Sequence, residues 1–116
     1  MTAQLERIWT GVCQYDWLLP ERGVAALIGS VQVAVFRTFE GMVHAVGNRD
    51  PFTGAYVLSR GIVGTRGDSP TVASPLHKQV FELTTGVCVS DDSVRIPVYA
   101  ARVRDGVVEV AVEASG

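Results

Sequence analysis

Apolar residues alternate with polar or small residues in several short segments of this chain, and valine is prominent among them. In residues 31–35, with the sequence VQVAV, three valines fall on one face of an extended strand, because successive side chains of a strand point to opposite faces. No stretch of a dozen residues has the i, i+3, i+4, i+7 spacing of an amphipathic helix. Valine is β-branched and is favoured in strands. The pattern therefore predicts an all-β protein.

Turn residues mark a hairpin in the first third of the chain. Gly29 and Ser30 separate the apolar segments 24–28 and 31–35. Glycine at the first central position of a two-residue loop favours a type II′ turn, which suits the twist of paired strands. We expect further strands at 7–12 and 42–46 and one helical turn at 15–19.

A second hairpin is predicted near the C-terminus. Asp105 and Gly106 separate the segments 99–104 and 107–113. An Asp-Gly pair tolerates the positive φ angles that a type I′ turn requires. In the second of these segments valines alternate with polar or small residues, so the valines should face the core.

The alternation is lost between residues 50 and 78, where proline, glycine, serine and threonine predominate. An irregular stretch of this length within a small domain usually carries a function or an interaction. We therefore predict one domain, residues 1–116, built as an antiparallel β-sandwich or small barrel, with a loop-rich part at about 48–86.

Charge and cysteine content exclude several classes of partner. The 116 residues carry 10 basic and 12 acidic side chains, and this balance lacks the basic field of a nucleic-acid-binding protein. No apolar run approaches the roughly 20 residues of a membrane span, and the first residues lack the apolar core of a signal peptide. Cys13 and Cys88 are far apart and suit free thiols in a reducing compartment, so we expect a cytoplasmic protein.

Three chemical motifs are each incomplete. The glycines spaced by three at 61–67 lack the Lys-Ser/Thr pair and the helix of a phosphate-binding loop. Ser74, His77 and Asp50 could form a hydrolase triad, but no Gly-x-Ser-x-Gly elbow surrounds the serine. His44 lies in a predicted strand and has no partner at metal-ligand spacing, so we expect an imidazole at the rim of the core.

Two segments resemble the cluster-binding boxes of Rieske domains. Residues 44–54, HAVGNRDPFTG, resemble the first box, which reads roughly A-V-x-N-x-C-P-H-x-G. Residues 74–86, SPLHKQVFELTTG, resemble the second, which reads roughly C-P-x-H-G-x-x-F-x-x-x-x-G. The similarity extends from about residue 7 to residue 112 and implies a Rieske-like, all-β fold.

The resemblance places the four ligand positions of a Rieske [2Fe–2S] cluster on Asp50, Phe52, Ser74 and His77. Such a cluster needs two cysteines and two histidines, and only the histidine at 77 is kept. Carboxylate and hydroxyl oxygens suit iron–sulfur clusters poorly, and Phe52 offers no donor atom. We therefore expect a domain without a cluster or other metal. Hydrogen bonds among Asp50, Ser74 and His77 should replace the metal bonds, with Phe52 packed between the loops.

Longer runs resemble the small subunits of assimilatory NAD(P)H-dependent nitrite reductases. These runs are NRDPF at 48–52, VLSRGIVG at 57–64 and ASPLHKQ at 73–79. The resemblance implies an accessory subunit of an oxidoreductase, with no catalytic residue of its own. Its large-subunit partner would reduce nitrite to ammonium in nitrate assimilation, with siroheme, a [4Fe–4S] cluster, FAD and NAD(P)H on that partner.

The two boxes also indicate where a partner would bind. An aromatic residue mixed with polar groups is typical of a contact surface. The expected contact residues are Arg49, Asp50, Pro51, Phe52, Pro75, His77, Lys78 and Gln79. Trp9 and Trp17 are expected to pack in the core or at its rim instead.

Two alternative functions remain open from the sequence. One is an electron carrier with an unusual metal centre held by His77, Asp50 and a cysteine. The other is a stand-alone, cluster-free protein-interaction module. Iron analysis tests the first alternative, and co-purification with a reductase tests the second.

Overall fold

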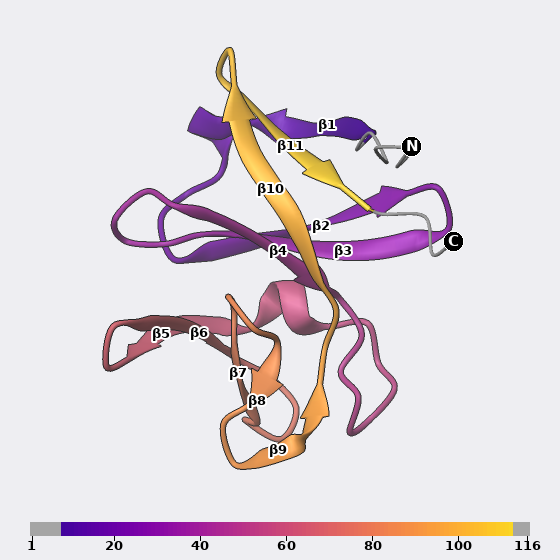
Figure 1. Ribbon diagram of the computed structural model, residues 1–116, viewed down its shortest axis with the longest axis vertical. Helices are drawn as coiled ribbons and strands as arrows, with labels where there is room; N and C mark the ends of the chain where they lie inside the picture. Colours follow the sequence, from indigo (N-terminus) through magenta and orange to yellow (C-terminus); the bar gives the residue numbers. More distant parts are fainter. Residues whose placement is uncertain (1–7, 113–116) are drawn as a thin grey trace, which may run out of the picture.

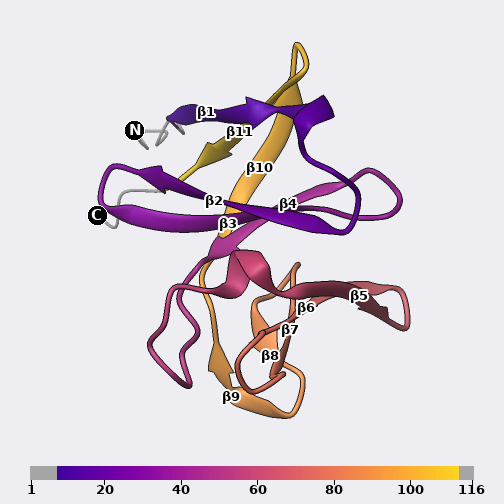
Figure 2. The same ribbon diagram turned by 180° about the vertical axis from the view of Figure 1, so that it is seen from behind.

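Antiparallel strands make up most of the computed structural model, which describes residues 8–112 (Figures 1 and 2). They form two sheets, one above the other in Figure 1. The all-β prediction is confirmed. The upper, six-stranded sheet contains, in spatial order, β1 (Trp9–Gln14), β11 (Val107–Ala111), β10 (Val98–Arg104), β4 (Val43–Gly47), β3 (Val31–Arg37) and β2 (Arg22–Ile28). The lower, five-stranded sheet contains β5 (Ile62–Arg66), β6 (Ser69–Ala73), β7 (Val80–Glu82), β8 (Val87–Cys88) and β9 (Asp91–Arg95).

Both predicted hairpins are confirmed. Strand β2 pairs with β3 from Ile28 opposite Val31, which leaves Gly29 and Ser30 as the turn, and φ is positive (61°) only at Gly29 of these two. At the other hairpin, β10 pairs with β11, and Asp105 and Gly106 have φ of 52° and 76°, as a type I′ turn requires. The expected helical turn at 15–19 is a 3-10 helix, η1 (Tyr15–Trp17). The strand expected at 7–12 is β1, and residue 7 lies outside the described residues.

The stretch 50–78 contains more regular structure than its sequence pattern indicates. It holds a 3-10 helix, η2 (Leu58–Arg60), and the hairpin of β5 and β6, whose turn is made by residues 67–68. The stretch is loop-rich on either side of these elements, and the helix and hairpin were not expected. These strands are short, and Gly64 and Pro70 interrupt the alternation. The two strands contribute the buried side chains Val63, Thr71 and Val72.

Strand β3 separates two hydrophobic clusters. Val33 and Val35 point into the upper cluster, which the curved first sheet encloses with side chains such as Val108 and Val110. Ala34 and Phe36 point to the other side, into the cluster between the sheets. That second cluster also contains Val46, Leu58, Val63, Val72, Phe81, Leu83, Cys88 and Ile96. Because successive side chains alternate, a strand buried on both faces joins the two sheets into one body.

The two tryptophans have different environments. Trp9 is half-buried, and the guanidinium of Arg102 lies 3.9 Å from its ring centroid while pairing with Glu109 at 2.7 Å. Trp17 follows in η1 with 72% of its surface exposed, so the expectation that it packs was wrong. Cys13 and Cys88 are both free thiols, as predicted. In the described part of the chain, no helix has the length and apolarity to cross a membrane.

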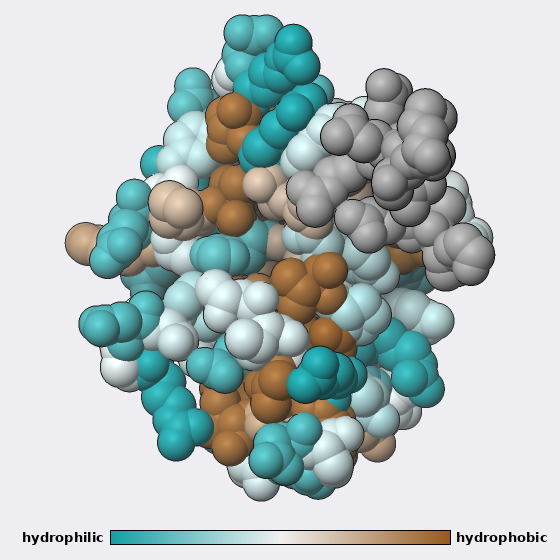
Figure 3. Space-filling view, in the orientation of Figure 1, coloured by the Kyte–Doolittle hydropathy of each residue, from teal (hydrophilic) through white to brown (hydrophobic). Residues whose placement is uncertain are grey.

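The face of the molecule in Figure 3 mixes hydrophilic and apolar side chains. Figure 3 shows hydrophilic side chains around the β10–β11 turn at the top. Apolar side chains are more frequent in the lower half of this view, over the second sheet.

Candidate functional site

Two loops meet at the ends of β4 and β6, and we call them the loop pair: residues 49–57 and residues 74–79. The first loop is closed by main-chain hydrogen bonds from Asp50 N to Ala55 O and from Gly54 N to Asp50 O, both 2.7 Å. These bonds fix the backbone around residue 50. They leave the side chain of Asp50 facing inward, with none of its surface exposed.

The second loop is also closed by main-chain hydrogen bonds. Ser74 N donates to Gln79 O at 2.8 Å, and Lys78 N donates to Ser74 O at 3.1 Å. Lys78 has a φ of 58°, a conformation that non-glycine residues rarely adopt. The loop thereby turns sharply and buries Ser74, which is 1% exposed.

The two loops are joined by one buried hydrogen bond. Ser74 Oγ donates to Asp50 Oδ2 at 2.5 Å, while the other oxygen, Asp50 Oδ1, accepts the N–H of Phe52 at 2.8 Å. Leu76 N approaches Ser74 Oγ at 3.4 Å. The two positions that match the cysteine ligands of the Rieske boxes are thus linked directly. We call this contact the Asp50–Ser74 staple.

The other two ligand positions do not join the staple. His77 is exposed and forms no side-chain hydrogen bond to any residue in the described range, so the expectation of a three-residue network was wrong. The Phe52 ring packs against Phe81 of β7, with centroids 6.2 Å apart and planes tilted by 46°. Phe52 remains 41% exposed. Imidazole and carboxyl therefore do not meet here, and neither a triad nor a shared metal site forms.

Most of the expected contact residues lie on the surface of the loop pair, but one does not. Asp50 is fully buried with both oxygens bonded, so its place among the contact residues was wrong. Gln79 is half-buried, and its Oε1 accepts a hydrogen bond from Ser90 at 3.0 Å. The exposed members are Arg49, Phe52, Pro75, His77 and Lys78, and Pro51 is partly exposed, as Gln79 is.

A basic hollow of about 290 Å³ adjoins the first loop. Arg49 and Arg95 line it together with Tyr56 and Tyr99, and among the described residues no acidic side chain does. With Lys78 on the second loop, this end of the molecule presents cations and aromatic rings. Such a surface suits an acidic patch on a protein partner.

Sequence reasoning gave no role to Asn48, which organises the first loop. It is 2% exposed. Its Oδ1 accepts the N–H of Ser59 at 2.8 Å, and its Nδ2 donates to Tyr56 O at 3.2 Å and to Gln32 Oε1 at 3.4 Å. Asn48 therefore ties the loop to η2 and to β3. In the sequence, the position of Asn48 between an apolar strand and a loop was the one signal for this role.

Two matching residues of the second box serve the fold. Phe81 is fully buried in the cluster between the sheets. Gly86 has a φ of 78°, and a Cβ there would overlap the carbonyl oxygen of Ile96. Only glycine fits such a close approach of two backbones. These positions of the box shape the lower sheet around the loop pair.

The residues of the loop pair do not fit an iron–sulfur cluster. Thiolate is the ligand that such clusters require, and an oxygen donor stands at each cysteine position and a phenyl ring at one histidine position. The Ser74 hydroxyl and the Asp50 carboxyl group already form a hydrogen bond with each other in the staple. Cys88 Sγ faces Ser90 Oγ at 3.5 Å on the lower sheet. In the range 8–112, no three His, Cys, Asp or Glu side chains converge as a metal site would need.

Comparison with known proteins agrees with this architecture. The sequence profile of the Rieske-like [2Fe-2S] domain family matches residues 8–111. The ferredoxin of carbazole 1,9a-dioxygenase from Nocardioides aromaticivorans shares the fold, with a TM-score of 0.77 at 24% identity over 90% of this chain and 98% of that one. This likeness confirms the Rieske-like architecture.

Closer relatives carry a more specific name. The nitrite reductase (NADH) small subunit of Escherichia coli K12 is 46% identical over 103 residues, which are 88% of this chain and 95% of that protein. A crystal structure described as an NADH-dependent nitrite reductase small subunit from Mycobacterium tuberculosis superposes with a TM-score of 0.91 at 52% identity, covering 94% and 98% of the two chains.

A third relative has a different length. The nitrite reductase [NAD(P)H] large subunit of Klebsiella oxytoca is 36% identical over 104 residues, which are 90% of this chain and 11% of that protein. A segment like this chain is thus part of that longer polypeptide. With its Rieske-like fold and these relatives, the chain belongs to the family of nitrite reductase small subunits.

Proposed function

We propose that this chain is an accessory subunit that binds the large subunit of a nitrite reductase through the loop pair and holds no cluster itself. The Asp50–Ser74 staple carries this proposal. It joins the two loops at the positions where a Rieske domain would hold them through iron. The loop pair is thus held together by a hydrogen bond, which cannot carry electrons.

The loop pair offers no group that accepts an electron, so its proposed role is to bind the large subunit and hold it in position. The reduction of nitrite to ammonium would then take place entirely on the large subunit. There the siroheme, [4Fe–4S] cluster, FAD and NAD(P)H would be held, with no catalytic residue on the small subunit. The small subunit would stabilise or orient the large one during nitrate assimilation.

The Klebsiella protein supports a physical association, because it carries a similar segment in the same polypeptide as a nitrite reductase large subunit. The basic hollow beside Arg49 and the exposed Lys78 support the loop pair as the contact face. The proposed contact residues are Arg49, Pro51, Phe52, Pro75, His77, Lys78 and Gln79. The free thiols support a reducing compartment, the cytoplasm, and we infer that residues 1–116 act there as one domain.

Purification of the tagged chain with its large subunit tests the association. We expect siroheme and flavin absorption to co-purify with the wild-type chain at near-stoichiometric levels. Arg49→Glu reverses a charge within the proposed contact and should weaken the complex about tenfold or more. Arg104→Glu is the matched control and should bind as wild type, since Arg104 is exposed at the end of β10, and the β10–β11 turn lies far from the lower sheet in Figure 1.

The isolated chain provides the second part of the test. We expect less than a tenth of an equivalent of iron and no visible absorption. Stoichiometric iron with an iron–sulfur spectrum would overturn the proposal in favour of an electron carrier. A chain that purifies alone, with no reductase from its own host, would instead indicate a stand-alone interaction module.

A further inference from the structure

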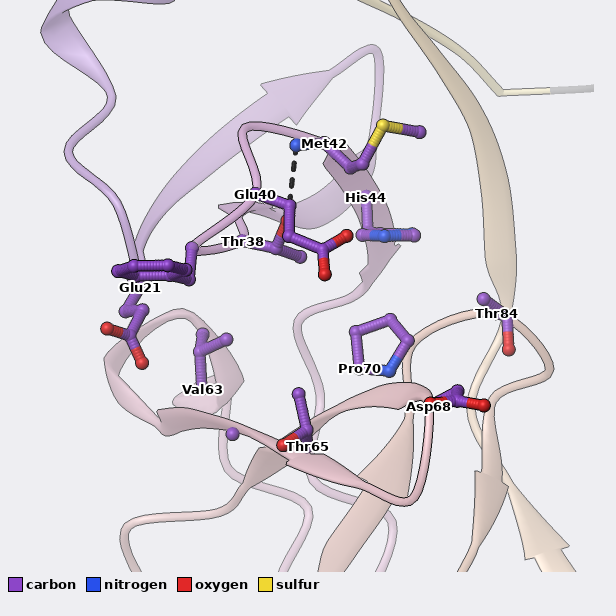
Figure 4. A pocket seen from close by; sticks show the side chains of 12 residues that line it. Glu21, Thr38, Glu40, Met42, His44, Val63, Thr65, Asp68, Pro70 and Thr84 are labelled. Atoms are coloured by element: carbon purple, nitrogen blue, oxygen red, sulfur yellow. Dashed lines mark hydrogen bonds between the residues drawn. The ribbon is translucent and has the colours of Figure 1, made fainter.

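An acidic cleft lies between the two sheets, opposite in charge to the basic hollow beside the loop pair. It is a cleft of about 470 Å³ between the turn that joins β3 to β4 and the β5–β6 hairpin (Figure 4). It shares no lining residue with the loop pair. Figure 4 shows Glu40, Met42 and His44 on the upper wall facing Thr65 and Pro70 on the lower one.

Both walls of the cleft carry apolar side chains, and those of the upper wall are exposed. Phe39 is 82% exposed and Met42 is 61% exposed, and Val63 and Pro70 line the opposite wall. Large apolar side chains that gather in a hollow, with polar groups at its rim, are typical of a protein-binding site. The cleft therefore offers a place for an apolar side chain from outside the molecule.

The turn that forms the upper wall is held firmly. Met42 N donates to Thr38 Oγ1 at 3.1 Å, and Thr38 N donates to Met42 O at 2.8 Å. The hydroxyl of Tyr15 donates to Gly41 O at 2.7 Å, and the guanidinium of Arg37 lies 4.2 Å from the Tyr15 ring centroid. A preorganised wall loses little conformational entropy when a partner binds.

The charges of the cleft all have one sign. Glu21, Glu40 and Asp68 line it, no lysine or arginine of the described residues does, and none of the three carboxylates forms an ion pair within the range 8–112. His44 does not offset them, because burial lowers the pKa of its imidazole and keeps it neutral at pH 7. An occupant that complements this cleft must bring positive charge.

We propose that the cleft receives a segment of the nitrite reductase large subunit that presents an apolar side chain flanked by lysine or arginine. This inference rests on the proposed function, since it names a second contact for the same partner. The loop pair is basic and the cleft is acidic. Two contacts of opposite charge would fix the orientation of the small subunit, because a reversed arrangement would bring like charges together.

Binding of the purified small subunit to the immobilised holo large subunit tests this inference at several salt concentrations. The combined variant Glu21→Gln, Glu40→Gln and Asp68→Asn removes the three charges from exposed positions. We expect its Kd to rise about tenfold or more, with a weaker dependence on salt. The variant Met42→Ala, which removes apolar surface only, should raise Kd several-fold with an unchanged salt dependence.

The matched control changes the same number of charges elsewhere. Asp16→Asn, Asp92→Asn and Asp105→Asn are all exposed and do not line the cleft. The control triple variant should bind as wild type, and thermal unfolding should show that all variants are folded. A cleft variant that binds as tightly as wild type would overturn this inference and leave the proposed function standing.

The same binding experiment has two further outcomes, each with its own meaning. If the wild-type chain itself does not bind the large subunit, the proposed function fails. If the small subunit forms a dimer that the cleft variant separates, the occupant is a second copy of this chain, and the inference is again overturned. Carbodiimide cross-linking adds a positive readout, because it should join Glu40 to lysines of the large subunit in the wild-type complex.

Discussion

The Asp50–Ser74 staple makes a quantitative prediction for the stability of the protein. Ser74→Ala removes the donor of a 2.5 Å hydrogen bond and leaves a fully buried carboxylate oxygen without a partner. Hydrogen bonds to charged groups contribute about 1.5–3 kcal/mol, and an unsatisfied buried group costs a similar amount. We therefore expect Ser74→Ala to lower the free energy of unfolding by about 2 kcal/mol and Tm by about 8 °C.

A double-mutant cycle separates the contact itself from other effects of each substitution. Urea unfolding of wild type, Asp50→Ala, Ser74→Ala and the double variant should give a coupling free energy of about 1.5–3 kcal/mol. The chain contains a control with the same chemistry. Ser93 Oγ donates to Asp91 Oδ1 at the same 2.5 Å, but this pair is exposed. Water replaces a lost partner there, so the Asp91–Ser93 cycle should show no measurable coupling.

Additive effects in the Asp50–Ser74 cycle would refute the reasoning. Such a result would mean that the two loops are held by their separate main-chain bonds and packing. The replacement of metal ligands by a hydrogen bond would then have no energetic consequence. Equal coupling in the buried and the exposed pair would contradict the role assigned to burial.

Two further predictions concern residues beside the loop pair and the cleft. Asn48→Ala should lower the free energy of unfolding by about 2 kcal/mol in urea, because three hydrogen bonds to its side chain are lost. Thr53→Ala in the adjoining loop, with one exposed bond, should change it little. Burial lowers the pKa of His44 from its ordinary 6.5, so the unfolded state binds the proton more readily, and stability should be complete above pH 6.5 and fall as the pH drops through the pKa of the folded state. His44→Gln should reduce this loss in thermal unfolding between pH 7 and pH 5, and His77→Gln, at an exposed position, should not; an unchanged acid profile in the first variant would contradict the assignment.

Local sequence determined the hairpins. The turn pairs at 29–30 and 105–106 have the backbone preferences of their turn types, and valine alternation directs the valines of β3 and β11 into the upper cluster. The β5–β6 hairpin also has a turn pair of this kind, Gly67 and Asp68, with a φ of 60° at Gly67, but its short strands lack the alternation of apolar residues. It forms because Val63 and Val72 complete the apolar cluster beneath β3, a contact between segments far apart in sequence.

The chemistry of the loop pair was only partly readable from the sequence. The residue types at the four ligand positions are local information, and they indicated donor atoms that suit a [2Fe–2S] cluster poorly. Which of those residues meet was decided by tertiary structure. The backbone of each loop turns Asp50 and Ser74 inward to one another and leaves His77 outside, because main-chain bonds set those directions.

The cleft could not be foreseen from the sequence at all. Its carboxylates come from three separate turns, at residues 21, 40 and 68, and no spacing pattern connects them. They share a surface because β3 carries one apolar cluster on each face and so holds the lower hairpin beneath the β3–β4 turn. Local sequence set most strands of the upper sheet, the hairpin turns and the residue types at the four ligand positions. The packing of two sheets against one doubly buried strand decided which polar side chains are brought together.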